Sequence, residues 1–457
     1  MLSLDLNKVF SDLENNWYKP PGLVLLLGIW FAITLSLAGI FQPSYLVYFL
    51  ILTIGVFLIV LIWHHFTVRL PKFPKNKLSF VVSIRCENES TKQKVREDFI
   101  KTIQGLLING PSGKLFHYVS VPERISRNLT NIEQVGEFQH KTKANFIIYG
   151  RVRERDVGGG KEDYFLDLDG YVSHAPISEN VSKIFGEEFG ELLPRKVRIG
   201  KEKDIYKFQF TSEWTLYVSK YIIAIALALS GMLEKALTLF NELNSELKNL
   251  IPPNKQLKNV KERVPRHICQ IHLAYCRHFH DLWRESKSDA YIDKLEYHLD
   301  AIPNTLRKNV NYYTIKAIFH FIKDRDTKKS EIYLLKIKDR YDVWYFNYAF
   351  IKAYDGNLKI AIHNYRKAIQ MSLDASKIIE IEEFIYWVVT NEKDKYQLYF
   401  CLGFYNWKIK KDLEQALNDF NSFLENIRDG QYKTESKLAT NWIKNIKQEI
   451  IKKKKSS

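Results

Sequence analysis

The stretch of residues 20–68 contains no Asp, Glu, Lys or Arg. Within it, two apolar runs, residues 22–41 and 45–63, are each about twenty residues long, which suffices for a helix to cross the roughly 30 Å hydrocarbon core of a bilayer. The connector Gln42-Pro43-Ser44 is too short to fold on its own and contains a proline, so we expect the chain to turn and cross back. The sequence therefore predicts a two-helix transmembrane hairpin.

The cations around this hairpin predict its orientation. Lys19 precedes the first run, whereas the connector carries no cation. Four cations follow the second run: Arg69, Lys72, Lys75 and Lys77. The positive-inside rule then predicts an inner (cytoplasmic) membrane protein with two spans, both ends and all soluble parts being in the cytoplasm. A cleaved signal peptide fits less well, because the first run follows a polar, partly acidic lead, residues 1–19, and a second run comes directly after it.

Small residues recur every four positions in the first run, at Gly28, Ala32 and Ser36. This spacing places them on one helix face and lets another helix approach closely. Two interpretations are open: the face packs against the second run of the same hairpin, or it joins neighbouring copies in a homo-oligomer.

The net charge of +16 on 457 residues exceeds what solubility requires. A membrane-tethered chain has an acidic counter-surface in anionic lipid, and the basic linker 69–77 and the tail Lys452–Lys455 can reach it. Nucleic acid is disfavoured as a partner, because no arginine-rich stripe or aromatic RNA-binding signature accompanies the charges. Four scattered cysteines make no disulfide framework, which agrees with a reducing cytoplasm.

Residues 78–211 predict an α/β domain with a mixed sheet. Short β-branched or alternating runs predict strands at 78–84, 116–121, 145–152 and 164–169, with one or two more near Val197 and 206–210. Helical spacing predicts helices at 93–107, 132–143 and 181–193. The third strand should run through Gly158-Gly159-Gly160 into the fourth as an antiparallel hairpin.

This order of elements, with the stretch Asn-Phe-Ile-Ile-Tyr-Gly-Arg-Val at 145–152, resembles the amino-terminal domain of TolB and the related curli and flagellar lipoproteins. The resemblance covers about residues 80–170. It implies a binding or assembly domain without catalytic residues. The usual home of that family is the periplasm, which disagrees with the charge pattern here.

Three features of this domain could carry chemistry, and none makes a convincing site. The run Gly158 to Lys161 lacks the hydroxyl residue and the following helix of a phosphate loop. Asp167 and Asp169 share one strand face, where solvated carboxylates are commoner than a cation site. Cys86 ends the first strand, where α/β folds often bind ligands, but no histidine or asparagine partner can be assigned to it. We therefore predict no catalytic residue, metal or cofactor.

Residues 212–457 are predicted to be helical and repetitive. The spacing Gly231-x4-Ala236-x3-Phe240 returns as Gly356-x4-Ala361-x3-Tyr365. It returns again, with one residue inserted in the turn, between Gly403 and Phe420. Helix pairs that lack these small residues are expected at 266–283 with 291–302 and at 311–322 with 328–339, and residues 434–451 should form a polar terminal helix. The repeats resemble tetratricopeptide repeats, which implies an all-α solenoid of stacked helix pairs.

In such a solenoid the first helix of each pair lines the inner wall. The positions predicted to face inward in the clearer repeats are Phe346, Phe350, Tyr354, Phe400, Phe404, Trp407 and Lys408. An aromatic groove at these positions suits a peptide or a partner helix. The alternative is that the rings pack against neighbouring repeats.

A cluster of cysteines and histidines lies between residues 267 and 280. Cys269, His272, Cys276 and His280 would share one helix face. A single straight helix cannot close a tetrahedral zinc site, because ligands seven residues apart are separated by about 10.5 Å. We therefore favour buried cysteines and ordinary histidines over a metal site.

Together these features predict a membrane-anchored cytoplasmic adaptor that holds a protein or peptide partner in a tetratricopeptide-like groove. Tethering would raise the effective concentration of that partner at the membrane. A second hypothesis is a ligand-sensing effector, in which the α/β domain binds a small molecule and associated hairpins perturb the bilayer. An enzyme seated in the α/β domain is a third, which the missing catalytic constellations disfavour.

Overall fold

The computed structural model describes the chain from Pro20 to Ser456 apart from residues 42–43, 69, 157–161, 177, 180–182, 184–196, 201–203, 249, 251–254, 339–341, 371–374 and 429. Five expectations lie outside these residues wholly or nearly so: the lead 1–19, the centre of the connector at Gln42-Pro43, Arg69, the turn 158–161 and the helix 181–193.

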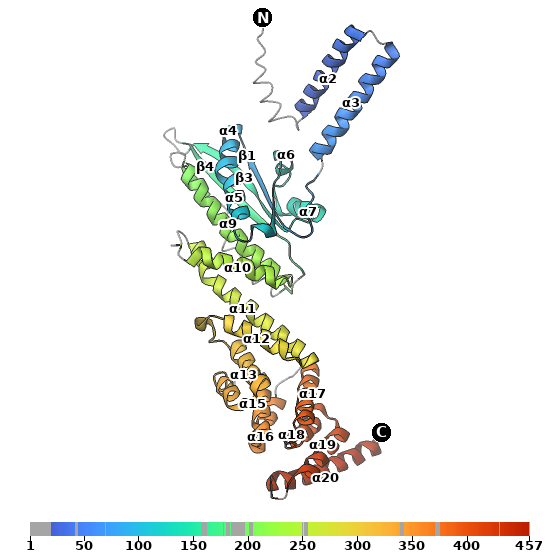
Figure 1. Cartoon of the computed structure of the whole chain (residues 1–457), viewed down its shortest axis with the longest axis vertical. Coiled ribbons are helices and arrows are strands. Elements are labelled where there is room, and N and C mark those ends of the chain that lie inside the picture. The colour runs from blue at the N-terminus through green and yellow to red at the C-terminus, as the bar shows by residue number, and fades with distance from the viewer. Residues whose placement is uncertain are drawn as a thin grey trace. The chain divides into compact units, whose positions relative to one another are not determined.

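Two apolar helices, α2 (Pro20–Phe41) and α3 (Tyr45–Val68), form an antiparallel hairpin and are long and apolar enough to cross a membrane (Figure 1). Their close approach is made by an aromatic ring and a glycine. A Cβ atom at Gly55 would lie 2.1 Å from the Trp30 indole, and Trp30 Nε1 donates to the Leu52 carbonyl at 3.4 Å. Most of the other large apolar side chains on both helices are exposed.

Gly28, Ala32 and Ser36 lie on an exposed face of α2. No atom lies within 4 Å of where a Cβ at Gly28 would be, and Ser36 Oγ donates to the Ala32 carbonyl of its own helix. The described hairpin therefore does not use this face to pack α2 on α3. Contact between neighbouring copies stays a prediction.

The α/β part contains a five-stranded mixed sheet in the order β2-β1-β3-β4-β5. The strands are β1 (Leu78–Cys86), β2 (Phe116–Ser120), β3 (Phe146–Asp156), β4 (Glu162–Val172) and β5 (Val197–Gly200). β1 pairs in parallel with β2 and β3, while β3–β4 and β4–β5 are antiparallel. The predicted mixed sheet, its strand order along the chain and the β3–β4 hairpin are confirmed.

Helices cover both faces of the sheet because β1 is followed by crossovers in opposite directions. One continuous helical segment, made of α4 (Glu89–Lys94), the π-helical η1 (Val95–Ile100) and α5 (Lys101–Asn109), precedes β2. The segments α6 (Glu123–Ser126) and α7 (Ile132–Thr142) precede β3 and share a core with Val81, Ile147 and Tyr149 of the sheet. Residues 93–107 and 132–142 are thus helical as predicted, and Lys143, expected to end the second helix, is its left-handed cap residue.

Helix α9 (Asp204–Leu229) packs against α5, η1, β4 and β5. The strand expected at 206–210 is wrong, since these residues belong to α9; a short alternating run cannot by itself be told from part of a helix. The next helix, α10 (Leu233–Lys248), is tied to the same domain. Lys220 of α9, only 1% exposed, donates to Glu242 and Glu246 of α10 at 2.7 and 2.9 Å, and Glu242 accepts the Ser112 N–H from the loop before β2.

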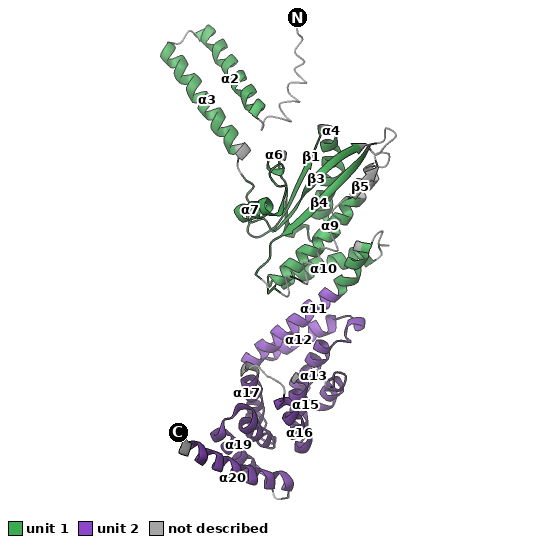
Figure 2. Ribbon diagram, turned by 180° about the vertical axis from the view of Figure 1, so that it is seen from behind, with its two compact units in different colours: residues 1–265 green, residues 266–457 purple. Residues whose placement is uncertain are grey.

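The chain divides into two compact units, residues 1–265 and 266–457 (Figure 2). The division falls after Pro265, inside helix α11 (Lys255–Ser286). The sequence suggested a boundary near residue 212, whereas α9 and α10 lie with the sheet. The repeat pattern specifies how two helices pair, but it does not specify what the pair packs against.

Residues 266–457 are helical throughout their described part. After α11 come α12 (Asp289–Ala301), α13 (Val310–Asp324), α14 (Thr327–Leu335), α15 (Asp342–Tyr354), α16 (Leu358–Ile369), α17 (Ala375–Asn391), α18 (Leu398–Tyr405), α19 (Leu413–Asn426) and α20 (Lys433–Ser456). The helices α13–α14, α15–α16 and α18–α19 pack as pairs. The predicted terminal helix corresponds to α20.

The turns explain the inserted residue of the third repeat. In the pairs α9–α10 and α15–α16 the turn is made by Gly231 and Gly356, whose φ angles are 75° and 81°. In the third pair a π-helical segment, η5 (Asn406–Lys410), extends α18, and Lys411 takes the left-handed conformation at φ 64°. A π-turn absorbs one extra residue within a helix, so the insertion lengthens the end of α18 before the turn.

Candidate binding cavity in the helical unit

The predicted groove residues are buried in the described structure. The six rings at Phe346, Phe350, Tyr354, Phe400, Phe404 and Trp407 are each 8% exposed or less, and the Lys408 Nζ lies 3.2 Å from the centre of the Trp407 ring. The structure therefore corrects the prediction of an open groove at these positions. The rings pack against neighbouring helices, which was the alternative interpretation.

Helix α20 explains the burial at the end of the helical unit. Its Trp442 ring lies 5.2 Å from the ring of Phe400, 5.6 Å from that of Phe404 and 6.0 Å from that of Trp407. The Trp407 Nε1 also donates to the Glu449 carboxylate at 3.2 Å. A terminal helix that covers the last pair thus fills the space where the groove was expected.

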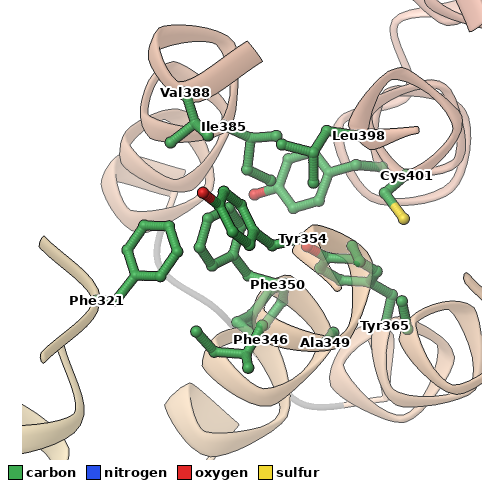
Figure 3. Close-up of a cluster of buried hydrophobic side chains, with 14 of the residues drawn as sticks. Phe321, Phe346, Ala349, Phe350, Tyr354, Tyr365, Ile385, Val388, Leu398 and Cys401 are labelled. Atoms are coloured by element: carbon green, nitrogen blue, oxygen red, sulfur yellow. The ribbon is translucent and has the colours of Figure 1, made fainter. Parts of the chain in front are cut away.

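An apolar cavity of about 260 Å³ lies elsewhere in the same unit, between α11, α13, α14, α15 and α17. Two of the predicted residues, Phe346 and Phe350, line it together with Phe321, Phe384 and Ile385. The Phe321 and Phe350 rings meet edge to face at 4.8 Å, and Phe350 and Phe384 lie 5.1 Å apart. Figure 3 shows Phe321, Phe350 and Ile385 converging from three helices.

Polar side chains line part of the cavity. Arg284 Nη1 donates to Glu380 Oε2 at 2.8 Å, with the two side chains 28% and 42% exposed. His280 Nδ1 lies 3.5 Å from Asp281 Oδ1. The amide Nδ2 of Asn347 is buried and has no hydrogen-bond partner among the described residues. The cavity thus combines apolar walls with a few polar groups, as small binding sites usually do.

We call these polar side chains the polar edge of the cavity, and a further cation lies next to them. Lys287 Nζ sits 4.9 Å from the ring centres of both Trp283 and Trp387 and donates to the Arg284 carbonyl at 2.5 Å. Burial, and then the Arg284 charge, lowers the pKa of Lys287. Two cations, Arg284 and Lys287, therefore lie close together at the end of α11.

Sequence reasoning missed most of this cavity. Phe321 falls in a helix without the diagnostic small residues, and Phe384 falls in α17, for which no pairing was predicted. Arg284 and Asn347 are polar residues on helices whose contacts depend on the whole fold. The signal that found part of it was the aromatic spacing of α15, which predicted that Phe346, Phe350 and Tyr354 face inward; the first two line the cavity.

The cysteine and histidine cluster lies on α11, and its His272 contacts a histidine of α12. His272 Nδ1 lies 2.9 Å from His298 Nδ1 of α12, and the Tyr275 ring stacks on His298 at 4.4 Å. Burial raises the pKa of Cys276 to about 12, and its Sγ faces the Leu295 carbonyl. Among the residues that the structure describes, no three metal-ligating side chains come together.

From the carboxyl ends of the neighbouring strands β1 and β3 the chain continues towards opposite sides of the sheet. Parallel α/β sheets usually bind ligands at such a point. Here the carboxylate of Glu154 accepts from Asn88 Nδ2 at 2.7 Å and from Thr91 Oγ1 at 3.2 Å, at the start of α4. The Thr91 N–H at this helix end is capped by Asn88 Oδ1, so Glu154 engages the side-chain donors beside the cap.

The aspartates of β4 were weighed as a cation site. Asp167 Oδ2 lies 3.7 Å from Arg151 Nε and 3.6 Å from Arg153 Nη2. Its charge is thus offset by arginines of the neighbouring strand β3.

No protein-family model, curated protein or solved structure matches this chain.

Proposed function

We propose that this protein is a membrane-anchored adaptor whose helical unit binds a partner protein by taking one apolar side chain of that partner into the cavity. The observation that carries the proposal is the cavity itself, because an apolar hollow of about 260 Å³ is left unfilled by the side chains that the structure describes. Val343, on the cavity lining, is 37% exposed, so the apolar surface continues outward from it. A buried apolar anchor surrounded by weaker contacts is the usual energetic centre of a protein interface.

Membrane attachment is the other half of the proposal. Two apolar helices of spanning length precede the domains, and basic residues follow them, which favours insertion into the inner membrane with the soluble parts in the cytoplasm. Lys72, Lys75 and Lys77, together with the lysines of the tail, would add attraction to anionic lipid. Tethering then confines the partner to the membrane surface.

The tetratricopeptide-like solenoid belongs to this proposal as well. The pairs α15–α16 and α18–α19 each connect through a left-handed turn residue, and small residues lie at their crossings, as such repeats require. The ligand-sensing effector is less favoured in its original form, since Glu154 already accepts from the side chains of Asn88 and Thr91 at the carboxyl edge of the sheet.

The test is site-specific photocrosslinking in the host membrane with the full-length chain. A benzophenone amino acid at Val343 is compared with the same label at Ile360 on α16, since both side chains are 37% exposed and only Val343 lines the cavity. We expect a discrete crosslinked protein from position 343 alone, and its loss in Ala317→Phe, which fills the cavity from its wall. Identical products at both positions, or a crosslink that survives Ala317→Phe, would contradict the proposal.

The topology is tested separately by protease treatment of sealed inner-membrane vesicles. A tag at the carboxyl terminus should be digested in inverted vesicles and protected in right-side-out vesicles. The reverse pattern would overturn the cytoplasmic placement without touching the cavity assignment.

A further inference from the structure

The shape of the cavity suits a small molecule at least as well as a side chain. Its volume of about 260 Å³ lies near the lower end of small-molecule sites, which range from about 300 to 1,000 Å³. The walls are apolar and rigid, since Phe321, Leu334 and Ile385 are each 3% exposed or less. Such a pre-formed hollow binds an apolar group without ordering new protein structure.

The polar edge has more donors than acceptors. A guanidinium carries five N–H groups, and among the described residues Arg284 makes one side-chain hydrogen bond, through Nη1 to Glu380. The buried Nδ2 of Asn347 makes none with the described residues. Ser330 offers no free donor, because its hydroxyl already donates to backbone carbonyls. A buried donor without an acceptor, such as Asn347 Nδ2, is costly. The Arg284 side chain is 28% exposed and has further donors to offer beside it, so this edge favours a ligand that brings an acceptor.

A carboxylate fits this edge better than an amine does. Glu380 occupies one edge of the Arg284 guanidinium and leaves the others for a second anion, since a planar fork can bond two carboxylates. Lys287, which bonds the Arg284 carbonyl, adds positive charge nearby. Glu380 lines the cavity itself, and its charge is offset by the bond to Arg284. Asp281 and Glu383 also oppose the positive charge, but both side chains are exposed, where water screens them.

We infer that the cavity binds a small amphiphilic carboxylate, with a medium-length alkyl or arylalkyl chain in the apolar hollow and the carboxylate on Arg284 and Asn347. A membrane-anchored chain is well placed to meet such compounds, because they partition into bilayers. The ligand and the apolar side chain of a partner would compete for the same space, so the inference gives the adaptor a small-molecule control.

Direct binding to the purified full-length chain in nanodiscs tests this inference without any partner protein. The probes are decanoate, decanol and decylamine, each labelled and below its micelle concentration, in equilibrium dialysis against empty nanodiscs as the partition control. Decanoate should bind at one site per chain and about tenfold tighter than decanol, the factor that one charge-assisted hydrogen bond supplies. Decylamine should bind most weakly.

Two variants on α11 separate the site from general charge effects. Arg284→Gln should abolish the preference for decanoate over decanol, whereas Arg277→Gln removes the same charge from an exposed position of the same helix and should leave the preference intact. Ala317→Phe should abolish saturable binding of all three probes. Should that variant fail to fold by circular dichroism, Val343→Trp narrows the cavity from its exposed side and serves instead.

The outcomes are distinct. Equal binding of acid, alcohol and amine, a preference for the amine, or no saturable binding above empty nanodiscs would overturn the inference. These outcomes would not affect the photocrosslinking test at Val343, which tests the adaptor proposal independently. Conversely, decanoate binding with no crosslinked protein would support the ligand site and contradict the adaptor proposal.

Discussion

The hairpin α2–α3 and the pair α18–α19 use the same contact in very different surroundings. In each, an aromatic ring of one helix lies on a glycine of the other: Trp30 on Gly55 in the hairpin, and Phe420 on Gly403 in the pair. Around Trp30 the side chains are mostly exposed, whereas around Phe420 they are buried under the Trp442 ring. A glycine lets two helices approach closely in both cases, but only the second contact is held by a surrounding core.

This difference predicts how strongly a larger residue at each glycine destabilises the surrounding structure. In α18–α19 an added side chain must displace a ring that has no room to move, because Phe400 and Trp442 lie against it at 6.0 and 5.5 Å. In the hairpin the displaced indole can swing outward at a smaller cost. The same substitution should therefore have a larger effect in the helical unit.

Gly403→Leu should have the largest effect of the changes considered. A Cβ there would lie 2.7 Å from the Phe420 ring, and overpacking a filled core costs about 3 kcal/mol. Hydrogen exchange of the full chain should lose protection in α18–α20 and not in the sheet. The control is Gly105→Leu in α5, where no atom lies within 4 Å of the added Cβ. Unchanged exchange in α18–α20 would refute the described contact.

Gly55→Leu should open the hairpin at a cost of about 2 kcal/mol, because its Cβ would meet the Trp30 indole at 2.1 Å. Electron–electron distance measurements between spin labels at Leu37 and Ile51, in a cysteine-free background in nanodiscs, should give a longer and broader distance. Gly28→Leu is the matched control and should leave that distance unchanged, since nothing lies near its Cβ. Equal effects of the two substitutions would mean that α2 is rotated from the described arrangement.

The comparison also shows what the sequence could predict. Helices, strands and the glycine at 403 follow from local spacing, because each is specified within one or two neighbouring elements. In the hairpin, small-residue spacing pointed to Gly28, yet α3 packs on the side of α2 that carries Trp30. Uncharged helices have apolar residues all round, so their sequence does not mark which face is inward.

The cavity was less predictable than the fold. Aromatic spacing in α15 grouped Phe346, Phe350 and Tyr354, of which Phe346 and Phe350 line the cavity. Whether a ring lines a hollow or fills a core depends on the helix opposite it. Phe400 and Phe404 are covered by Trp442, whereas Phe346 faces a space that α13 and α17 leave open. Such differences arise from contacts between helices far apart in the chain, which periodicity within one helix does not contain.

Acid should destabilise the α11–α12 contact of the helical unit and leave the hairpin unchanged. Burial, and then the neighbouring His272, lowers the pKa of His298 to about 4, and burial lowers that of His272. The unfolded histidines titrate near 6.5, so the unfolded state binds more protons between these values, and stability should fall as the pH drops from about 6.5 towards 4. Hydrogen exchange at the α11–α12 contact should quicken in this window. His298→Phe should reduce the response, and a response that persists unchanged would assign it to other groups.

The hairpin serves as the internal reference in that titration. Residues 22–63 contain no Asp, Glu, Lys, Arg or His, so the label distance across α2 and α3 should stay constant over the same range. A parallel change in both regions would indicate general acid denaturation instead of titration of the His272–His298 pair.

The smallest expected effect lies at the turn that follows α18. Lys411 holds the left-handed conformation that Gly231 and Gly356 hold in the other two pairs, and a side chain in that conformation costs about 1 kcal/mol. Its side chain is exposed and its backbone N–H bonds the Asn406 carbonyl, so Lys411→Gly should keep every described contact and stabilise the pair by about that amount. Exchange in α18–α19 should slow about fivefold. Lys411→Ala removes the same charge but keeps the Cβ, so it should give little gain. If alanine stabilises as much as glycine, the gain comes from relieving the crowding of Lys411 with Lys408 and Lys410, and the third turn is not strained.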